Sequence, residues 1–238
     1  MSGRLRGAAL VLLAAATFPI AATLGAGPAQ AAPGEDRILP ADQYTSAKAR
    51  RLAETHHGAL REINAAVYHC LPWVEVARQS IGFFKPRNAP QDDRYLSIRI
   101  YIEQDPSPQF ATLRMEDRGS AMFSRYVGHL LRRMTRSPAL AAETAVDGFT
   151  IILEWLKQTP RAGGRPIHET VAVFVPRVVA IDYLAGRIPI GQVANGSKVF
   201  GWDGETALGE LKLTAWDDNF ATTFKVANYE LEPGVTCP

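Results

Sequence analysis

Residues 149–175 read FTIILEWLKQTPRAGGRPIHETVAVFV, and this stretch decides the fold class. The segment 149–156 is an apolar run that follows Asp147-Gly148, which predicts a β-strand. The loop 159–166 separates it from 170–175, a continuous apolar stretch typical of a central strand. We therefore expect two strands in this part of the chain.

A second strand pattern lies upstream, over residues 95–103. One face of this segment is apolar, through Leu96, Ile98, Ile100 and Ile102. The sequence DPSP at 105–108 consists of turn-forming residues, and the apolar positions in 111–115 alternate again. This pattern predicts a central β-hairpin.

Helices are expected on both sides of that hairpin. Residues 45–70 have apolar side chains at spacings of three and four, and 74–81 is a candidate for a short second helix. Residues 120–136 present a wide apolar face. Ser137-Pro138 then supplies the N-cap and first position of a further helix.

The C-terminal half is expected to be rich in β-structure, with short helices opened by Pro176 and Pro189. A turn at Asp218-Asn219 would place the apolar residues of 211–213 and 224–226 on one side of an antiparallel hairpin. The predicted fold class is therefore α+β, with N-terminal helices, a central β-hairpin followed by helices, and a β-rich C-terminal half.

The N-terminus has the order of a Sec-type signal peptide. Arg4 and Arg6 precede an apolar stretch, and the small-residue sequence Ala-Gln-Ala follows at 29–31. We expect cleavage between Ala31 and Ala32, with an uncleaved anchor helix as the alternative. No later segment has the ~18 consecutive apolar residues of a spanning helix. The expected location is periplasmic or extracellular.

The domain boundaries follow from composition. Residues 32–42 are rich in proline, glycine and charge, which predicts a poorly ordered leader. The globular region is expected to span 43–238, either as one domain or as two packed halves, 43–147 and 148–238.

The charge balance excludes one class of protein. The 238 residues include 26 basic and 24 acidic side chains, a formal charge of +2. The surplus lies in the signal peptide, so the chain that follows has 24 of each. A neutral chain has no excess charge to offset phosphates, and we expect no nucleic-acid partner.

The chain has two cysteines, Cys70 and Cys237, and both follow the cleavage site. In an oxidising compartment a disulfide between them is the favoured interpretation. The alternative is two unrelated thiols, with Cys70 packed on an apolar helix face.

Common catalytic signatures are missing from the sequence. It lacks a Gly-x-Ser-x-Gly elbow, a Cys-x-x-Cys pair, a phosphate-binding glycine loop and a dinucleotide fingerprint. His168-Glu169 begins like a zincin helix, but Ala172 stands where the second histidine would be. We expect neither a metal nor a cofactor.

A stripe of arginines is the clearest local charge feature. Arg118, Arg125, Arg132 and Arg136 follow spacings of seven, seven and four along the helix expected at 120–136. Such a stripe suits an anionic partner. The alternative is a solvated helix face whose arginine stems cover apolar neighbours.

The predicted C-terminal hairpin offers a second candidate surface. Its polar face would display Lys212, Trp216 and Lys225, and an exposed Trp beside lysines suits a glycan or an extended peptide. The alternative is that another element covers Trp216.

These features favour a non-enzymatic, exported binding or envelope-interaction module for an anionic or glycan-like envelope component or a partner protein. The rival hypothesis is an envelope hydrolase that uses dispersed carboxylates such as Glu103, Glu116 and Asp117. A third is a purely structural member of an envelope complex.

Overall fold

The computed structural model describes residues 35–87, 89–102, 107–158, 166–216 and 234–237. They belong to one compact unit, Ala32–Pro238. Helices and a large mixed sheet make up this unit, which confirms the α+β class. The predicted signal peptide at 1–31 lies outside the described residues.

Helices and strands alternate in groups along the described part of the chain. The helices are η1 (Glu35–Arg37), η2 (Ala41–Gln43), α1 (Ala47–Thr55), α2 (His57–Cys70), α3 (Pro108–Ala111), α4 (Met115–Met134), α5 (Pro138–Ala142), α6 (Arg177–Leu184) and α7 (Ile190–Gly196). The strands are β1 (Val74–Val76), β2 (Gly82–Phe84), β3 (Tyr95–Ile102), β4 (Gly148–Gln158), β5 (Ile167–Pro176), β6 (Lys198–Asp203) and β7 (Thr206–Glu210).

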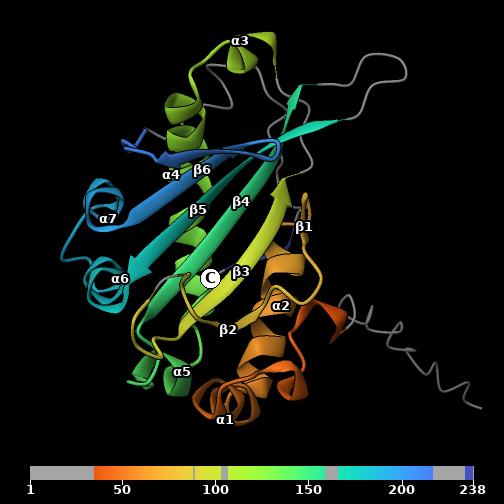
Figure 1. Cartoon of the computed structure of the whole chain (residues 1–238), viewed down its shortest axis with the longest axis vertical. Helices are drawn as coiled ribbons and strands as arrows, with labels where there is room; N and C mark the ends of the chain where they lie inside the picture. The colour runs from red at the N-terminus through yellow and green to blue at the C-terminus, as the bar shows by residue number, and fades with distance from the viewer. Residues whose placement is uncertain (1–34, 88, 103–106, 159–165, 217–233, 238) are drawn as a thin grey trace, which may run out of the picture. The chain divides into compact units, whose positions relative to one another are not determined.

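The strands form one sheet in the order β1-β3-β4-β5-β6-β7, and β2 also pairs with β3 (Figure 1). β3 and β4 are parallel, whereas the other pairs are antiparallel. The strands predicted at 149–156 and 170–175 are β4 and β5, and they lie at the centre of the sheet. Both predictions are confirmed.

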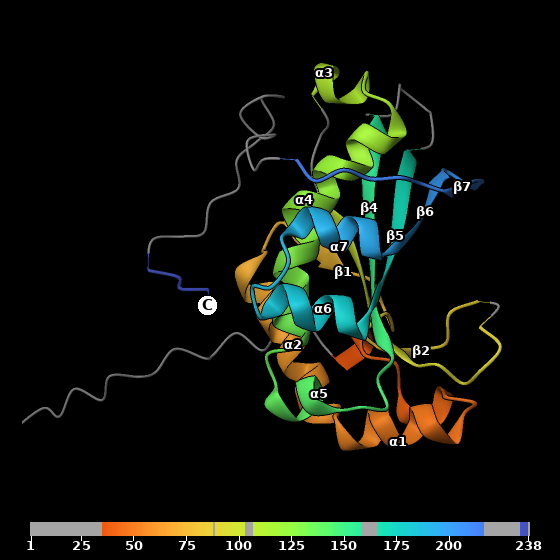
Figure 2. The same ribbon diagram turned by 90° about the vertical axis from the view of Figure 1, so that its left-hand side faces the viewer.

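The two faces of the sheet have different surroundings. Figure 2 shows α4, α6 and α7 on one face. Most side chains on this face are buried and apolar, among them Leu96, Ile98, Ile100, Phe149, Ile151, Leu153, Val171, Val173 and Val199. The residues between them point to the opposite face, where most are only partly buried. We call this opposite face the open face.

The central hairpin forms from different partners than expected. β3 pairs with the preceding β2, while 111–115 contains the end of α3 and the start of α4 instead of a strand. β3 is parallel to β4, and a parallel pair needs a long crossover connection. The 20-residue α4 supplies it, because it returns the chain along the helix-covered face (Figure 2).

The N-terminal helical region differs from the prediction in two places. The helix expected at 45–70 is divided at His56 into α1 and α2. The short helix expected at 74–81 was wrong, because this segment contains β1 and the connection to β2. Val74 and Val76 are buried while Glu75 is exposed, which is the period of a strand.

The described part of the expected leader is ordered. Ile38 is 4% exposed and forms a parallel bridge with Ile81. The backbone N–H of Ile81 donates to the carbonyl of Arg37 at 3.0 Å. The apolar pair Ile38 and Leu39 therefore joins the leader to the core.

The helices after β5 follow the sequence signals. α6 begins after Pro176 and α7 after Pro189, as predicted. Gly186 has φ +71° just beyond α6, a conformation that glycine adopts without strain. Another glycine, Gly128 in α4, leaves room for Tyr183 of α6: an added Cβ would lie 2.3 Å from the Tyr183 hydroxyl.

The segment 211–216 follows its predicted alternation without forming a strand. Leu211 and Leu213 are buried, and their neighbours are exposed. The backbone N–H groups of Thr214 and Trp216 donate to the hydroxyls of two serines of α4, at 3.0 and 2.7 Å. The remainder of the expected hairpin, around Asp218-Asn219 and Lys225, lies outside the described residues.

The two halves proposed at 43–147 and 148–238 share one sheet. β3 of the first half pairs with β4 of the second over eight residue pairs. A single hydrophobic cluster includes side chains from both halves. In the described part of the chain, no helix is long and apolar enough to cross a membrane.

A buried ion pair joins α4 to the centre of the sheet. Arg118 of α4 is 5% exposed and Glu169 of β5 is 0% exposed. Two nitrogens of the Arg118 guanidinium donate to the two carboxylate oxygens of Glu169, with Nε to Oε2 at 2.7 Å. Trp155 of β4 also donates to Glu169, at 3.0 Å. The remaining nitrogen of Arg118 donates to the carbonyls of Ala111 and Leu113.

The predicted disulfide between Cys70 and Cys237 is present. It links the C-terminal end of α2 to the C-terminal tail, with a sequence separation of 167 residues and a Cα–Cα distance of 5.6 Å. The bond closes a long loop and therefore restricts the unfolded chain.

We predict that Glu169→Gln lowers the free energy of unfolding by about 3–5 kcal/mol, because it leaves the Arg118 charge buried without a counter-charge. Urea unfolding measures this loss. The double variant Arg118→Met/Glu169→Gln should recover most of it, since both charges are then gone. The exposed Glu62→Gln serves as the control. A double variant as unstable as the single one would contradict this account.

We predict that the purified protein without its first 31 residues contains no alkylatable thiol until it is reduced. Non-reducing mass measurement after alkylation tests this directly, and two labelled thiols would refute the disulfide. In the chain-entropy model, Cys70→Ser/Cys237→Ser should lose about 4–5 kcal/mol of unfolding free energy.

Candidate functional site

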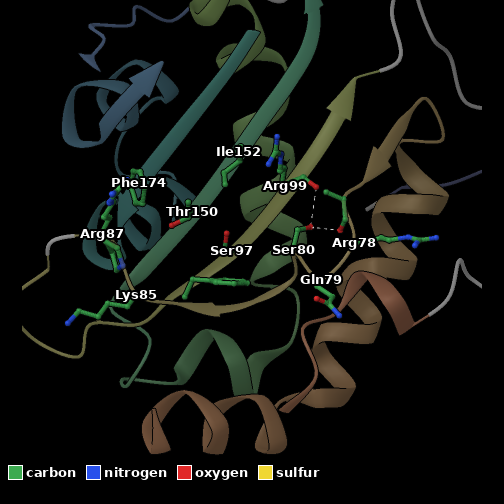
Figure 3. Close-up of a pocket in the computed structure, with 13 residues that line it drawn as sticks. Arg78, Gln79, Ser80, Lys85, Arg87, Ser97, Arg99, Thr150, Ile152 and Phe174 are labelled. Carbon is green, nitrogen blue, oxygen red and sulfur yellow. Dashed lines mark hydrogen bonds between the residues drawn. The ribbon is translucent and has the colours of Figure 1, made fainter. Parts of the chain in front are cut away.

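A pocket of ≈ 370 Å³ lies on the open face of the sheet. Figure 3 shows its floor and its two sides. The floor comes from β3, β4 and β5, through Ser97, Thr150, Ile152 and Phe174. One side is the connection between β1 and β2, residues 77–80, and the other is 84–87, at the end of β2 and beyond it.

The floor residues meet because of strand register. Ser97 pairs with Thr150, and Thr150 pairs with Phe174, so these three side chains form one row across the sheet. Ser97 and Thr150 are each 5% exposed. The row places two small hydroxyl side chains beside one aromatic ring.

Two further aromatic rings lie beside Phe174, Tyr95 from β3 and Phe200 from β6. The Phe174 ring lies 6.3 Å from that of Tyr95 and 6.0 Å from that of Phe200, both edge to face. Burial is the main cause that raises the pKa of Tyr95, and Asp93 and Asp147 add to it. Burial of the Tyr95 ring disfavours the charged phenolate. Of these three rings only Phe174 lines the pocket, and it gives the floor an apolar surface.

Four cationic side chains surround the pocket: Arg78, Lys85, Arg87 and Arg99. No aspartate or glutamate is among the described residues that line it. Arg78 pairs with Asp36 at 3.2 Å, and Arg99 pairs with Glu154. Lys85 and Arg87 are exposed, and neither has an ion-pair partner in the described part of the chain.

Glu154 holds Arg99 in place from outside the pocket. Its Oε2 accepts from Arg99 Nε at 3.0 Å and from Nη2 at 2.5 Å. Its Oε1 lies 3.2 Å from Nδ1 of His168, whose ring lies edge-on to Tyr101 at 5.2 Å between centroids. This carboxylate offsets part of the Arg99 charge that would otherwise face the pocket.

The connection between β1 and β2 is held by several hydrogen bonds. Ser80 Oγ donates to the carbonyls of Ala77 at 2.7 Å and Arg99 at 3.3 Å. Gln79 has φ +51°, in the left-handed region that non-glycine residues rarely adopt. Its N–H donates to the carbonyl of Asp36 at 2.8 Å. This side of the pocket is therefore preformed.

The arginine stripe predicted on α4 does not form one exposed surface. Arg118 points toward the sheet, where it pairs with Glu169. The residues that follow it in α4, 119–123, are all buried, so this part of the helix has little exposed surface. Arg132 and Arg136 are exposed, and the Arg132 Cζ lies 5.3 Å from the centroid of the Tyr183 ring. Arg125 is half-buried beside a second cavity, described below.

The second predicted surface is also divided. Lys212 is exposed, but Trp216 is half-buried and packs against the hydrophobic core beside α4. Lys225 lies outside the described residues. A platform made from all three therefore lacks the exposed Trp on which the prediction depended.

The carboxylates of the hydrolase hypothesis lie apart from the pocket. Glu116 and Asp117 are in the first turn of α4, where negative charge is favourable. Asp117 pairs with Arg114 at 2.9 Å. Glu103 lies outside the described residues. No cluster of three or more metal-ligating side chains occurs among the residues described.

Sequence reasoning missed the pocket, although two signals for it exist. In residues 83–87, FFKPR, two basic residues follow two aromatic ones closely. In 95–103, polar residues alternate with the apolar ones, which indicates that one face of this strand is not part of the core. The sequence does not show that these segments lie beside Thr150 and Phe174, because that proximity depends on sheet order.

We compared the chain with protein-family models, with curated proteins and with solved structures, and none of them matches it.

Proposed function

We propose that the protein is an exported binding module that holds an anionic, partly apolar ligand in the pocket on the open face. The single observation behind this proposal is the composition of the lining. Four cationic side chains surround an apolar and hydroxyl floor, and no carboxylate is among the described lining residues.

Electrostatics favour an anion at this pocket. Lys85 and Arg87 have no ion-pair partner among the described residues. A unit charge 4 Å away gains about 1 kcal/mol in water and more where solvent is partly excluded. Ser97 and Thr150 can donate or accept hydrogen bonds on the floor, which helps to orient a bound group.

The size and walls of the pocket suit a small molecule. Its volume of ≈ 370 Å³ lies in the range of about 300–1,000 Å³ for ligand pockets. Phe174 and Ile152 give it an apolar surface. A ligand with an aromatic or aliphatic body and an acidic group would satisfy both parts of the lining.

The lining supports binding rather than hydrolysis at this pocket. The described lining includes hydroxyl and amine groups, on Ser80, Ser97, Thr150 and Lys85, which act as nucleophiles only when they are activated, commonly by an adjacent base. None of the described lining residues is a carboxylate or a histidine, the usual side chains for that role. The described lining supplies charge, hydrogen bonds and apolar contact.

Export is supported by two independent features. The order of residues in 1–31 is that of a cleaved signal peptide. The Cys70–Cys237 bond is of the kind that persists in oxidising compartments. We therefore place the binding module in the periplasm or outside the cell.

We predict that 8-anilinonaphthalene-1-sulfonate, an aromatic anion, binds this pocket. Lys85→Gln/Arg87→Gln should weaken its binding about tenfold at low ionic strength, because two unpaired positive charges are removed. Fluorescence titration measures both affinities. The neutral analogue N-phenyl-1-naphthylamine should bind both proteins equally, since it lacks the sulfonate.

The matched control is Arg51→Gln/Lys212→Gln, which removes two exposed charges outside the pocket. It should bind the sulfonate as the wild type does. Near-UV circular dichroism verifies that each variant is folded. Equal binding by the pocket variant and the wild type, or loss of binding in the control, would overturn the proposal.

A second substitution should strengthen the binding of the sulfonate. Glu154→Gln removes the carboxylate that pairs with Arg99, so the Arg99 charge becomes available to the pocket. The sulfonate should then bind a few times more tightly than to the wild type. Glu62→Gln on α2 makes the same charge change away from the pocket. Unchanged or weaker binding by Glu154→Gln would count against the assignment of Arg99.

A further inference from the structure

A second cavity lies on the opposite side of the sheet from the pocket. It has a volume of ≈ 290 Å³ and lies between the end of α2, the Cys70–Cys237 bond and the middle of α4. Three residues of α4 line it at intervals of four: Arg125, His129 and Arg133. Side chains four residues apart lie on one face of a helix, so these groups face the cavity together.

Arg133 is the unusual residue of this cavity. It is 7% exposed, and its Nη1 donates to the carbonyl of His129 at 2.9 Å. Its Nε is buried and has no hydrogen-bond partner among the described residues. No described carboxylate pairs with it. A buried guanidinium in this state lacks both a counter-charge and a full set of acceptors.

Two other arginines differ from Arg133 in their surroundings. Buried Arg94 and partly buried Arg177 also have one buried nitrogen each without a hydrogen-bond partner. Arg94, however, pairs with Asp92. The pKa of Glu143 is lowered mainly by the Ala145 N–H and to a smaller extent by Arg177, so Arg177 has a carboxylate nearby.

The charged neighbours of Arg133 are themselves positive. Burial is the main cause that lowers the pKa of the Arg133 guanidinium, and Arg132 and Arg136 lower it further. No aspartate or glutamate is among the described residues that line the cavity. An anion in the cavity would supply the counter-charge that Arg133 lacks among the described residues.

We propose that this cavity binds a phosphate-type oxyanion, held by Arg133 and Arg125. Guanidinium groups match the geometry of such anions and donate two hydrogen bonds at once. His129 lines the same cavity, and an imidazole N–H can donate a hydrogen bond to an oxyanion. The Trp73 indole and the disulfide form apolar walls that can accommodate an ester substituent on the phosphate. The site is separate from the pocket on the open face.

The proposal makes a distinctive prediction for Arg133→Met. Without phosphate, this variant should be at least as stable as the wild type, because the substitution removes an unpaired buried charge. Inorganic phosphate should raise the melting temperature of the wild type and leave that of the variant almost unchanged. Isothermal titration should show one phosphate per wild-type chain and binding at least about tenfold weaker in the variant.

Three further variants make the test independent of folding. Arg125→Gln changes a half-exposed residue and should also weaken phosphate binding. Arg136→Gln, an exposed residue of the same stripe that does not line the cavity, should bind as the wild type does. Lys85→Gln/Arg87→Gln should retain phosphate binding, since it alters only the other site. Potassium chloride at equal ionic strength controls for screening.

Phenyl phosphate, compared with inorganic phosphate in the Lys85→Gln/Arg87→Gln variant so that the pocket on the open face contributes little, distinguishes the source of the oxyanion. Tighter binding of phenyl phosphate than of inorganic phosphate assigns the cavity to a phosphate ester, and the reverse order assigns it to the free ion. The proposal is overturned if neither compound binds. It is also overturned if Arg133→Met and Arg125→Gln respond to phosphate as the wild type does, or if chloride stabilises equally.

Discussion

The buried pair of Arg118 and Glu169 fixes how the two layers of this protein meet. The carboxylate comes from a central strand and the guanidinium from the crossover helix, and Trp155 donates to the same carboxylate. Breaking such a pair is costly, because the remaining charge cannot leave the core. The pair therefore holds α4 on one face of the sheet. α6 and α7 lie on the same face as α4, and the pocket lies on the other face (Figure 2).

Because the two faces of the sheet differ, the charged side chains that stabilise the core are separate from those that are exposed to a ligand. Arg118 lies on the helix-covered face and its donors are used inside the core. On the open face, Lys85 and Arg87 are exposed beside a floor of apolar and hydroxyl side chains (Figure 3). The chain after the predicted cleavage site is neutral in total. Its affinity for an anion would therefore depend on where these few side chains lie, and less on net charge.

The sequence predicted strands correctly where the spacing of apolar residues fits only one kind of secondary structure. The continuous apolar run of 170–175 and the alternation from Leu96 to Ile102 predicted strands that are present, because both patterns admit few other structures. Three residues, Val74 to Val76, are too few to show a period, and the segment 111–115 has an alternation that a helix start can also produce. Spacing along α4 likewise identified an arginine stripe but not which residues are buried. That depends on what packs over the helix.

The pocket could not be predicted because its residues come from distant parts of the chain and meet only through strand order.

The most direct test of the account is to map backbone amide chemical shifts while 8-anilinonaphthalene-1-sulfonate is added. The account predicts the largest changes at Ser97, Thr150 and Phe174 and in 84–87. Changes centred instead on Arg132 and Arg136, or on 211–216, would contradict it.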